Sequence, residues 1–197
     1  MSQSQIYGIA SLQTSTETPS IEKLVSEYAA YISRLARSIL DDGNPQLEAE
    51  VDDAVQETFL AANRTMEGFR GEASVKTWLT SIAVNICRGK LRKRKLQHGL
   101  LKQLQGILLL NKAASPEEAA IQKEGDQRLW AAVDALGEKH RLPVILHYVH
   151  ELGIPEIAEI LRTNQGTVYS RLHYARQKLA TVLAYAYGKE VAHETQN

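Results

Sequence analysis

Residues 153–180 read GIPEIAEILRTNQGTVYSRLHYARQKLA, and this stretch decides the fold of the C-terminal half. Its first part has apolar residues at helical spacing, with Pro155 where the first turn of a helix tolerates it. Asn164 is a good N-cap for a second helix. The buried stripe expected of that helix comprises Val168, Leu172, Ala175 and Leu179. Two helices joined by a turn of about four residues indicate a helix-turn-helix.

The opposite face of the second helix is polar and basic. It carries Thr167, Tyr169, Ser170, Arg171, Tyr174, Arg176 and Lys178. No acidic residue occurs from Gln165 until Glu190, as expected of a helix that must lie among phosphates. The alternative is an ordinary helical hairpin with a solvated face, which is a common arrangement.

Composition excludes several classes of protein. The chain has 197 residues, 23 basic and 23 acidic, so its net charge is zero. The single Cys87 rules out an internal disulfide or a cysteine-based zinc cluster. We find no apolar run of the roughly 18 residues that a membrane span needs and no signal peptide, so we expect a cytoplasmic protein without membrane insertion.

The charges are nevertheless unevenly distributed. Seven acids and no Lys or Arg lie between Arg37 and Arg64, whereas nine Lys or Arg and no acid lie between Glu72 and Glu117. Six of those cations fall within residues 88–95, more than a helix dipole requires. An acidic block followed by a basic block suggests two different partners, the second of them a polyanion.

Helical periodicity extends over both halves, and no strand or repeat is evident, so we predict an all-α protein of two small domains. We expect helices over residues 20–40, 48–66, 75–95, 116–136 and 142–152, before the helix-turn-helix, whose last helix should stop at Gly188. The expected divisions are a disordered tail (1–20), a first domain (21–96), a linker (97–125), a second domain (126–187) and a tail (188–197). The linker is unusually apolar over residues 100–110, which predicts that it packs on a domain or binds a partner.

Several short motifs, in this order, resemble the extracytoplasmic-function (ECF) sigma factors of bacterial RNA polymerase. Their conserved region two is matched by VDDAVQETFL at 51–60, FRGE at 69–72, TWL at 77–79 and IAVN at 82–85. Region four is matched by LGEKHR at 136–141, GTV at 166–168 and SRL at 170–172. The tail and the linker are not matched.

The resemblance implies partners and site residues. Core RNA polymerase, through its beta-prime and beta subunits, and promoter DNA would be the partners, with an anti-sigma factor as a candidate inhibitor. Residues expected to dock on the beta-prime clamp helices are Asp52, Asp53, Gln56 and Glu57. Those expected at the minus-ten element, for base capture or phosphate binding, are Arg70, Asn85, Arg88, Arg92, Lys93 and Arg94. Those expected to read the minus-thirty-five element are Gln165, Thr167, Tyr169, Ser170, Arg171 and Tyr174.

The chain departs from the family pattern at three positions. Tyr169 and Tyr174 stand where many relatives have Lys or Arg, and tyrosine cannot bind guanine as arginine does. Arg162 occupies a turn position where glycine is usual, at a cost of about 1–2 kcal/mol if its backbone is left-handed. The minus-thirty-five preference therefore does not follow from the family.

Two other functions would account for parts of the sequence. A stand-alone helix-turn-helix regulator would explain residues 153–180 but neither the acidic nor the basic block. A metal protein would use His140, His147, His150 and Glu151, but histidines near a helix end are more often surface residues. We expect no enzyme activity, no cofactor and no metal.

Overall fold

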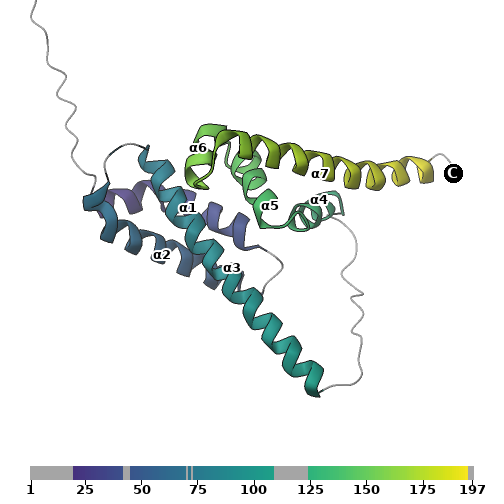
Figure 1. Ribbon diagram of the computed structural model, residues 1–197, viewed down its shortest axis with the longest axis horizontal. Helices are drawn as coiled ribbons and strands as arrows, with labels where there is room; N and C mark the ends of the chain where they lie inside the picture. The colour runs from purple at the N-terminus through teal and green to yellow at the C-terminus, as the bar shows by residue number, and fades with distance from the viewer. Residues whose placement is uncertain (1–19, 42–44, 70, 72, 109–123, 195–197) are drawn as a thin grey trace, which may run out of the picture.

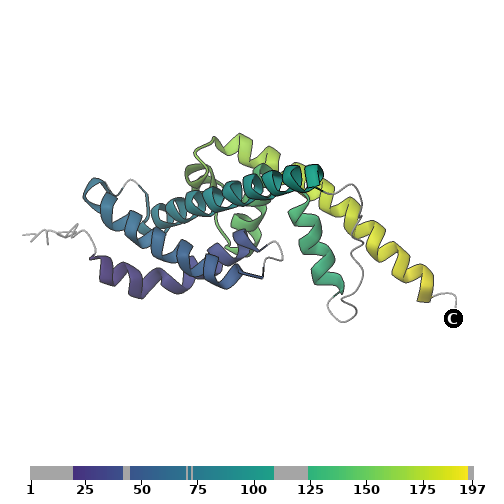
Figure 2. The same cartoon turned by 90° about the horizontal axis from the view of Figure 1, so that it is seen from below.

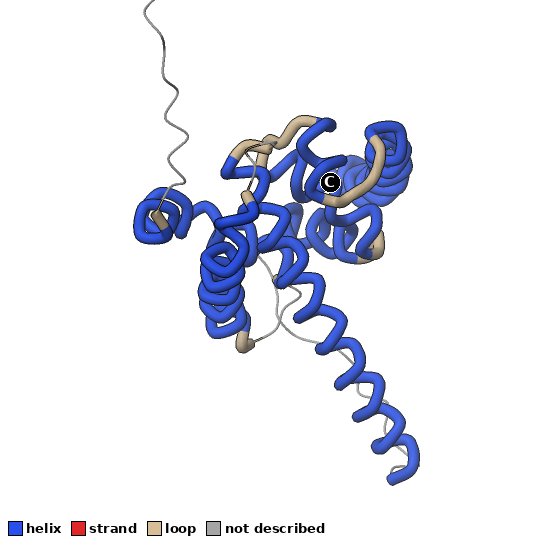
Figure 3. The backbone as a smooth tube through the Cα atoms, turned by 60° about the vertical axis from the view of Figure 1, so that its left-hand side comes forward, coloured by secondary structure: helices blue, strands red, loops and turns tan. Residues whose placement is uncertain are grey.

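The computed structural model describes residues 20–41, 45–69, 71, 73–108 and 124–194, and the regular elements within them are all helices (Figure 3). The predicted all-α fold is confirmed. The helices form two bundles that lie against each other (Figure 1). None of the described helices combines the length and apolarity needed to cross a membrane. Except for Ser20, the predicted tail lies outside the described residues.

The N-terminal bundle consists of α1 (Ile21–Leu40), α2 (Leu47–Thr65), the short 3-10 helix η1 (Met66–Gly68) and α3 (Val75–Leu108). Its three long helices pack on one another around fully buried side chains such as Ile32, Leu35 and Leu79. Ser20 caps α1 by accepting a hydrogen bond from the Lys23 amide. Ser74 accepts one from the Thr77 amide at 3.0 Å and starts α3, as its position predicts.

Helix α3 is longer than the sequence suggested. The predicted end at Lys95 is wrong, because α3 continues to Leu108 and its last turns project away from both bundles (Figure 1). Leu and Gln make up eight of the thirteen added residues and favour helix, and no proline interrupts them. Whether the apolar run packs stays a prediction, because its side chains lie outside the described part of the structure.

The C-terminal bundle consists of α4 (Glu124–Asp134), α5 (Glu138–Val144), the π-helix η2 (Ile145–Val149), α6 (Ile154–Ile160) and α7 (Gln165–Glu194). Leu142, Ile145, Ile157 and Val168 are buried at its centre. The predicted stop at Gly188 is wrong, since α7 runs on to Glu194. A glycine inside a helix costs only about 1 kcal/mol relative to alanine and does not by itself end the helix.

Pro143 is not in the first turn of a helix over residues 142–152, as we had expected. Helix α5 begins earlier, after Gly137 with its positive φ of 75°, and Pro143 lies inside it. Proline donates no backbone hydrogen bond, and the helix widens directly after it into the π-helix. The His150 amide accordingly bonds to the Ile145 carbonyl, five residues back, at 3.2 Å.

The two bundles meet along α1 and α3. Figure 2 shows α1 and α2 on one side of α3, and α6 with the start of α7 on the other. His150, at the end of η2, bonds through Nε2 to the Ser38 hydroxyl at 2.9 Å. Its ring also lies edge-on to the Tyr31 ring, with centroids 5.6 Å apart. The histidine therefore joins the bundles.

Acid should weaken this contact. Burial lowers the pKa of His150 below its ordinary value, and the cations Arg34 on α1 and Lys76 on α3 lower it further. As pH falls through the ordinary histidine pKa, the unfolded chain binds the proton before the folded chain does, so folded stability is lost. We expect the melting temperature of His150→Gln to fall less between pH 7.5 and pH 5.5 than that of the wild type. His173→Gln, which removes an exposed imidazole on α7, is the control; equal losses in all three proteins would contradict the prediction.

Candidate nucleic-acid interface

One face of α2 is acidic and exposed. Asp52, Asp53, Gln56 and Glu57 all lie on it, as the sequence predicts from their spacing. Lys90 of α3 partly neutralises this face, because its Nζ lies 2.8 Å from Glu57 Oε1 and 3.9 Å from Asp53 Oδ2. Among the described residues, Asp52 and Gln56 make no side-chain hydrogen bond or ion pair, so they are accessible to a partner.

Sequence reasoning missed Leu60 on this face. It follows Gln56 by one turn and is 56% exposed, although it is a large apolar residue. The exposure of Leu60 could have been predicted, since other residues of α2 already form its buried face. An exposed leucine beside carboxylates gives a docking surface both charge and apolar contact area.

The loop between α2 and α3 is anchored at its start. The ring of Phe69 packs on Trp78 of α3, with centroids 4.8 Å apart. Gly71 has a positive φ of 71°, which glycine adopts without strain. Arg70, a predicted DNA contact in this loop, lies outside the described residues.

The predicted DNA contacts on α3 fall into two groups. Asn85, Arg92 and Lys93 are exposed, and the first two lie seven residues apart on one side of the helix. Arg94 instead bonds to Glu50 of α2 and to the Leu40 carbonyl of α1, and only 13% of its side chain is exposed. In this conformation Arg94 ties the N-terminal bundle together and is not presented to a ligand.

Arg88 is also engaged, but by the other bundle. Its Nε lies 2.5 Å from Glu138 Oε1 of α5. Arg88 follows Asn85 by three residues and precedes Arg92 by four, so the three share one stripe of α3. Asn85, Arg88 and Arg92 thus form a polar, cationic stripe on α3, and Arg88 is paired across the bundle interface.

The helix-turn-helix is formed as predicted, with α6 and α7 as its two helices. Arg162 in the turn is left-handed, with φ 49°, and the Thr163 amide bonds to the Ala158 carbonyl at 2.9 Å. Asn164 caps α7 by accepting a hydrogen bond from the Thr167 amide at 2.7 Å. The turn therefore contains a left-handed backbone conformation, which glycine adopts without strain, at an arginine.

The outward face of α7 faces solvent, but its residues differ in how exposed they are and in the contacts they make. Gln165, Tyr169 and Ser170 are exposed, whereas Thr167 and Arg171 are partly covered. Tyr174 stacks on His140 of α5, with centroids 4.3 Å apart, and Lys178 lies over its ring. Tyr169, 58% exposed, is therefore the freer of the two tyrosines.

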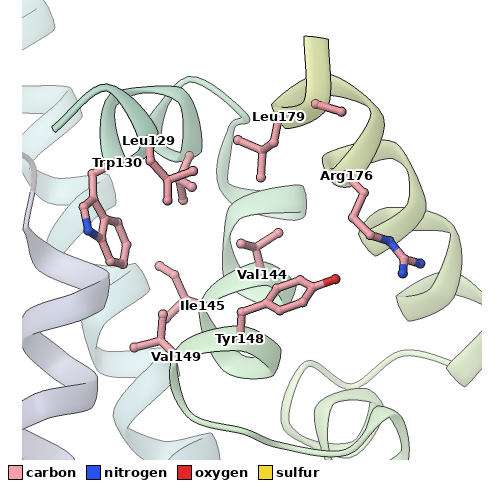
Figure 4. Close-up of a pocket in the computed structure, with 10 residues that line it drawn as sticks. Leu129, Trp130, Val144, Ile145, Tyr148, Val149, Arg176 and Leu179 are labelled. Atoms are coloured by element: carbon pink, nitrogen blue, oxygen red, sulfur yellow. The ribbon is translucent and has the colours of Figure 1, made fainter. Parts of the chain in front are cut away.

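The C-terminal bundle also has a hollow, and its lining is mainly apolar. It measures about 630 Å³ and lies between α4, η2 and α7 (Figure 4). Its walls include Trp130, Tyr148 and Val149, all substantially exposed, and among the described residues that line it the only charged one is Arg176. An apolar hollow suits an apolar partner and not phosphates.

The histidines considered as metal ligands do not converge. His140 packs on Tyr174, His147 bonds to the Leu152 carbonyl at 3.0 Å, and His150 bonds to Ser38. Within the described ranges, no three His, Cys, Asp or Glu residues are grouped so that they could hold a metal ion. Cys87 is buried, which raises its pKa to about 12, so it is kept as a neutral thiol in the core.

Comparison with known proteins matches each bundle to a protein family. The sigma-70 region 2 family matches residues 24–97, and the sigma-70 region 4 family matches residues 126–179. The ECF RNA polymerase sigma factor SigW of Bacillus subtilis (strain 168) is 30% identical over 137 residues, which are 66% of this chain and 73% of SigW. The ECF RNA polymerase sigma-E factor of Escherichia coli (strain K12) is 28% identical over 163 residues, 79% of this chain and 82% of that protein.

Solved structures share the fold. CnrH in complex with the cytosolic domain of CnrY gives a TM-score of 0.59 at 24% identity, covering 84% of this chain and 88% of CnrH. The sigma factor RpoE of Bartonella quintana, in complex with the anti-sigma factor NepR, gives 0.60 at 21% identity, covering 82% and 95%. The chain belongs to the ECF sigma factors of RNA polymerase. It acts in the initiation of transcription.

Proposed function

We propose that this chain binds core RNA polymerase through α2 and directs it to promoters through two DNA contacts, one on each bundle. The observation that carries the proposal is that a single chain exposes an acidic face on α2, a cationic stripe on α3 and an acid-free recognition face on α7. A stand-alone regulator needs only the last of these.

The acidic face of α2 is the polymerase dock in this proposal. Asp52, Asp53, Gln56 and Glu57 would meet the clamp helices of the beta-prime subunit, and Leu60 adds apolar contact area to the same face. Lys90 holds Asp53 and Glu57 at the surface without covering Asp52. Complementary charges across such an interface speed association and select the partner.

The loop after η1 and the stripe on α3 would act at the minus-ten element. Extracting a base from the duplex costs a few kcal/mol of stacking, so its capture needs a pocket and cations together. Asn85 offers the amide that can bond to a base edge, while Arg92 and Lys93 are exposed for phosphates. Arg88 joins them once it is released from Glu138.

The exposed face of α7 would read the minus-thirty-five element in the major groove. Gln165 and Tyr169 are placed near the helix N-terminus, which enters the groove in helix-turn-helix proteins. A tyrosine there makes one hydrogen bond or packs on a thymine methyl. We therefore infer that the preferred minus-thirty-five sequence does not depend on a contact between Tyr169 and guanine.

Regulation and location are part of the same proposal. An anti-sigma factor is the expected inhibitor, and the RpoE neighbour bound to such a partner supports this. The chain would act in the cytoplasm, where the polymerase is, and would have no catalytic activity of its own.

Reconstituted transcription tests the proposal. Core polymerase is supplied with a pool of genomic fragments from the source organism, with and without this chain, and the 5′ ends of the transcripts are sequenced. We expect the chain to create a set of start sites that share two upstream elements. Start sites that are unchanged by the chain, or tight sequence-specific binding to duplex DNA without polymerase, would favour the stand-alone regulator.

A further inference from the structure

The side chain of Arg141 crosses from the C-terminal bundle into the N-terminal bundle. Its Nη1 donates to the Ile39 carbonyl at 2.7 Å, and its Nη2 donates to the carbonyls of Ser38 at 3.3 Å and Asp41 at 3.1 Å. Its Nε bonds to Asp134 of α4 at 2.7 Å. Arg141 is only 8% exposed, so one guanidinium is buried between the bundles, and each of its three nitrogens donates at least one hydrogen bond.

These contacts lie at the C-terminus of α1. The last four carbonyls of a helix have no partner within the helix, and the helix dipole places negative charge there. A guanidinium with several N–H donors in one plane is suited to such a set of oxygens. In this protein three carbonyls at the end of α1 are thus capped by a residue about 100 positions later in the chain, and these bonds exist only while the bundles are together.

A second contact lies on α3. Arg88 pairs with Glu138, and the two line a small crevice of about 230 Å³ together with Lys139, Leu142, Leu161 and Arg171. Arg88 is among the residues expected at the minus-ten element, and Arg171 is among those expected at the minus-thirty-five element. Two turns of DNA, about 70 Å, would separate such elements. Residues that border one small crevice cannot contact both elements at once.

We propose that the free chain is held closed by a latch made of Arg141 on the α1 carbonyls and Glu138 on Arg88, and that the latch must open before both promoter elements are read. The latch itself depends only on the contacts above; its effect on promoter reading rests on the proposed function. Core polymerase opens the latch because it binds the open arrangement better. His150 on Ser38 adds a third, pH-sensitive contact to the same interface.

The distance between the bundles is the direct test. Spin labels are attached to cysteines introduced at Asn63 on α2 and Gln177 on α7, both exposed. The native Cys87 is buried and stays unlabelled in the folded protein. Pulsed electron paramagnetic resonance on the free full-length chain then reports the populations of short and long distances.

Three variants are compared with the wild type. Arg141→Lys keeps the charge but loses the planar set of donors, Glu138→Arg repels Arg88, and Glu138→Arg combined with Arg88→Glu restores the pair in reverse. We expect each single variant to raise the ratio of open to closed chains at least about tenfold, since bonds from a charged donor are among the stronger hydrogen bonds. The combined variant should return most of that shift. Glu22→Arg, an exposed reversal on α1 away from the latch, should change nothing.

The outcomes separate the latch from the proposed function. Circular dichroism first establishes that each variant keeps its helix content. Folded single variants with the wild-type distance distribution would overturn the latch, and so would a reverse pair that stays as open as Glu138→Arg alone. Added core polymerase should shift the wild type to the long distance. If polymerase does not bind at all, the proposed function fails while the free-chain distances still decide the latch.

Discussion

The double variant Asp52→Lys, Asp53→Lys should bind core RNA polymerase at least about a hundredfold more weakly than the wild type does. Both carboxylates are exposed on α2, and neither contributes to the core. Like charges brought together across an interface cost several kcal/mol, and a hundredfold loss corresponds to only about 2.7 kcal/mol. The measurement is a titration of labelled core polymerase with the variant chain, without DNA, at two salt concentrations.

A matched reversal elsewhere controls for net charge. Glu22→Lys combined with Glu159→Lys changes the charge by the same amount at exposed positions on α1 and α6. This control should bind core polymerase nearly as tightly as the wild type. The docking hypothesis is rejected if the two double variants lose the same affinity, because the effect would then come from the overall field of the chain and not from α2.

The second large effect is expected at the minus-ten end. Asn85→Ala should reduce open-complex formation on duplex promoter about tenfold or more, since base capture must offset a few kcal/mol of unstacking. Asn85 is exposed on α3, so its loss should not disturb the fold. A template that is already melted at the minus-ten element removes the unstacking cost, and on it the variant should recover much of its activity.

The recognition helix should behave in the opposite way. Tyr169→Ala and Ser170→Ala should each weaken discrimination at the minus-thirty-five element, on duplex and pre-melted templates alike, and leave core binding unchanged. Gln177→Ala, exposed further along α7, is the matched control. If pre-melting fails to rescue Asn85→Ala even in part, or if the Tyr169 and Ser170 variants keep full discrimination, the two bundles do not divide the promoter in this way.

Local features of the fold could be predicted from the sequence. The caps at Ser20, Ser74 and Asn164 follow from short-range chemistry, because a side-chain oxygen bonds to an amide three residues later. The exposed face of α2 likewise follows from helical spacing alone. The family resemblance marked Arg162 as an unusual residue for its turn position, and its backbone is left-handed there, with φ 49°.

Features that depend on distant partners could not be predicted. Arg141 is one cation in a recognisable motif, and nothing nearby in sequence indicates that it caps α1. The family resemblance assigned Arg94 to phosphates, yet its partners are Glu50 and Leu40, which precede it by more than 40 residues. The end of α3 was missed for another reason: its apolar residues were interpreted as a connector, although they also favour helix.

The added turns of α3 change how far the two DNA contacts can be separated. As extended chain, the segment between the bundles would reach roughly 100 Å. With residues 96–108 helical, that part spans only about 20 Å, and the residues joining Leu108 to Glu124 add at most about 55 Å. The sum is close to the roughly 70 Å of two DNA turns. In the proposed arrangement with both contacts made, this shorter reach, added to the widths of the two bundles, limits the longest promoter spacing that the chain can bridge.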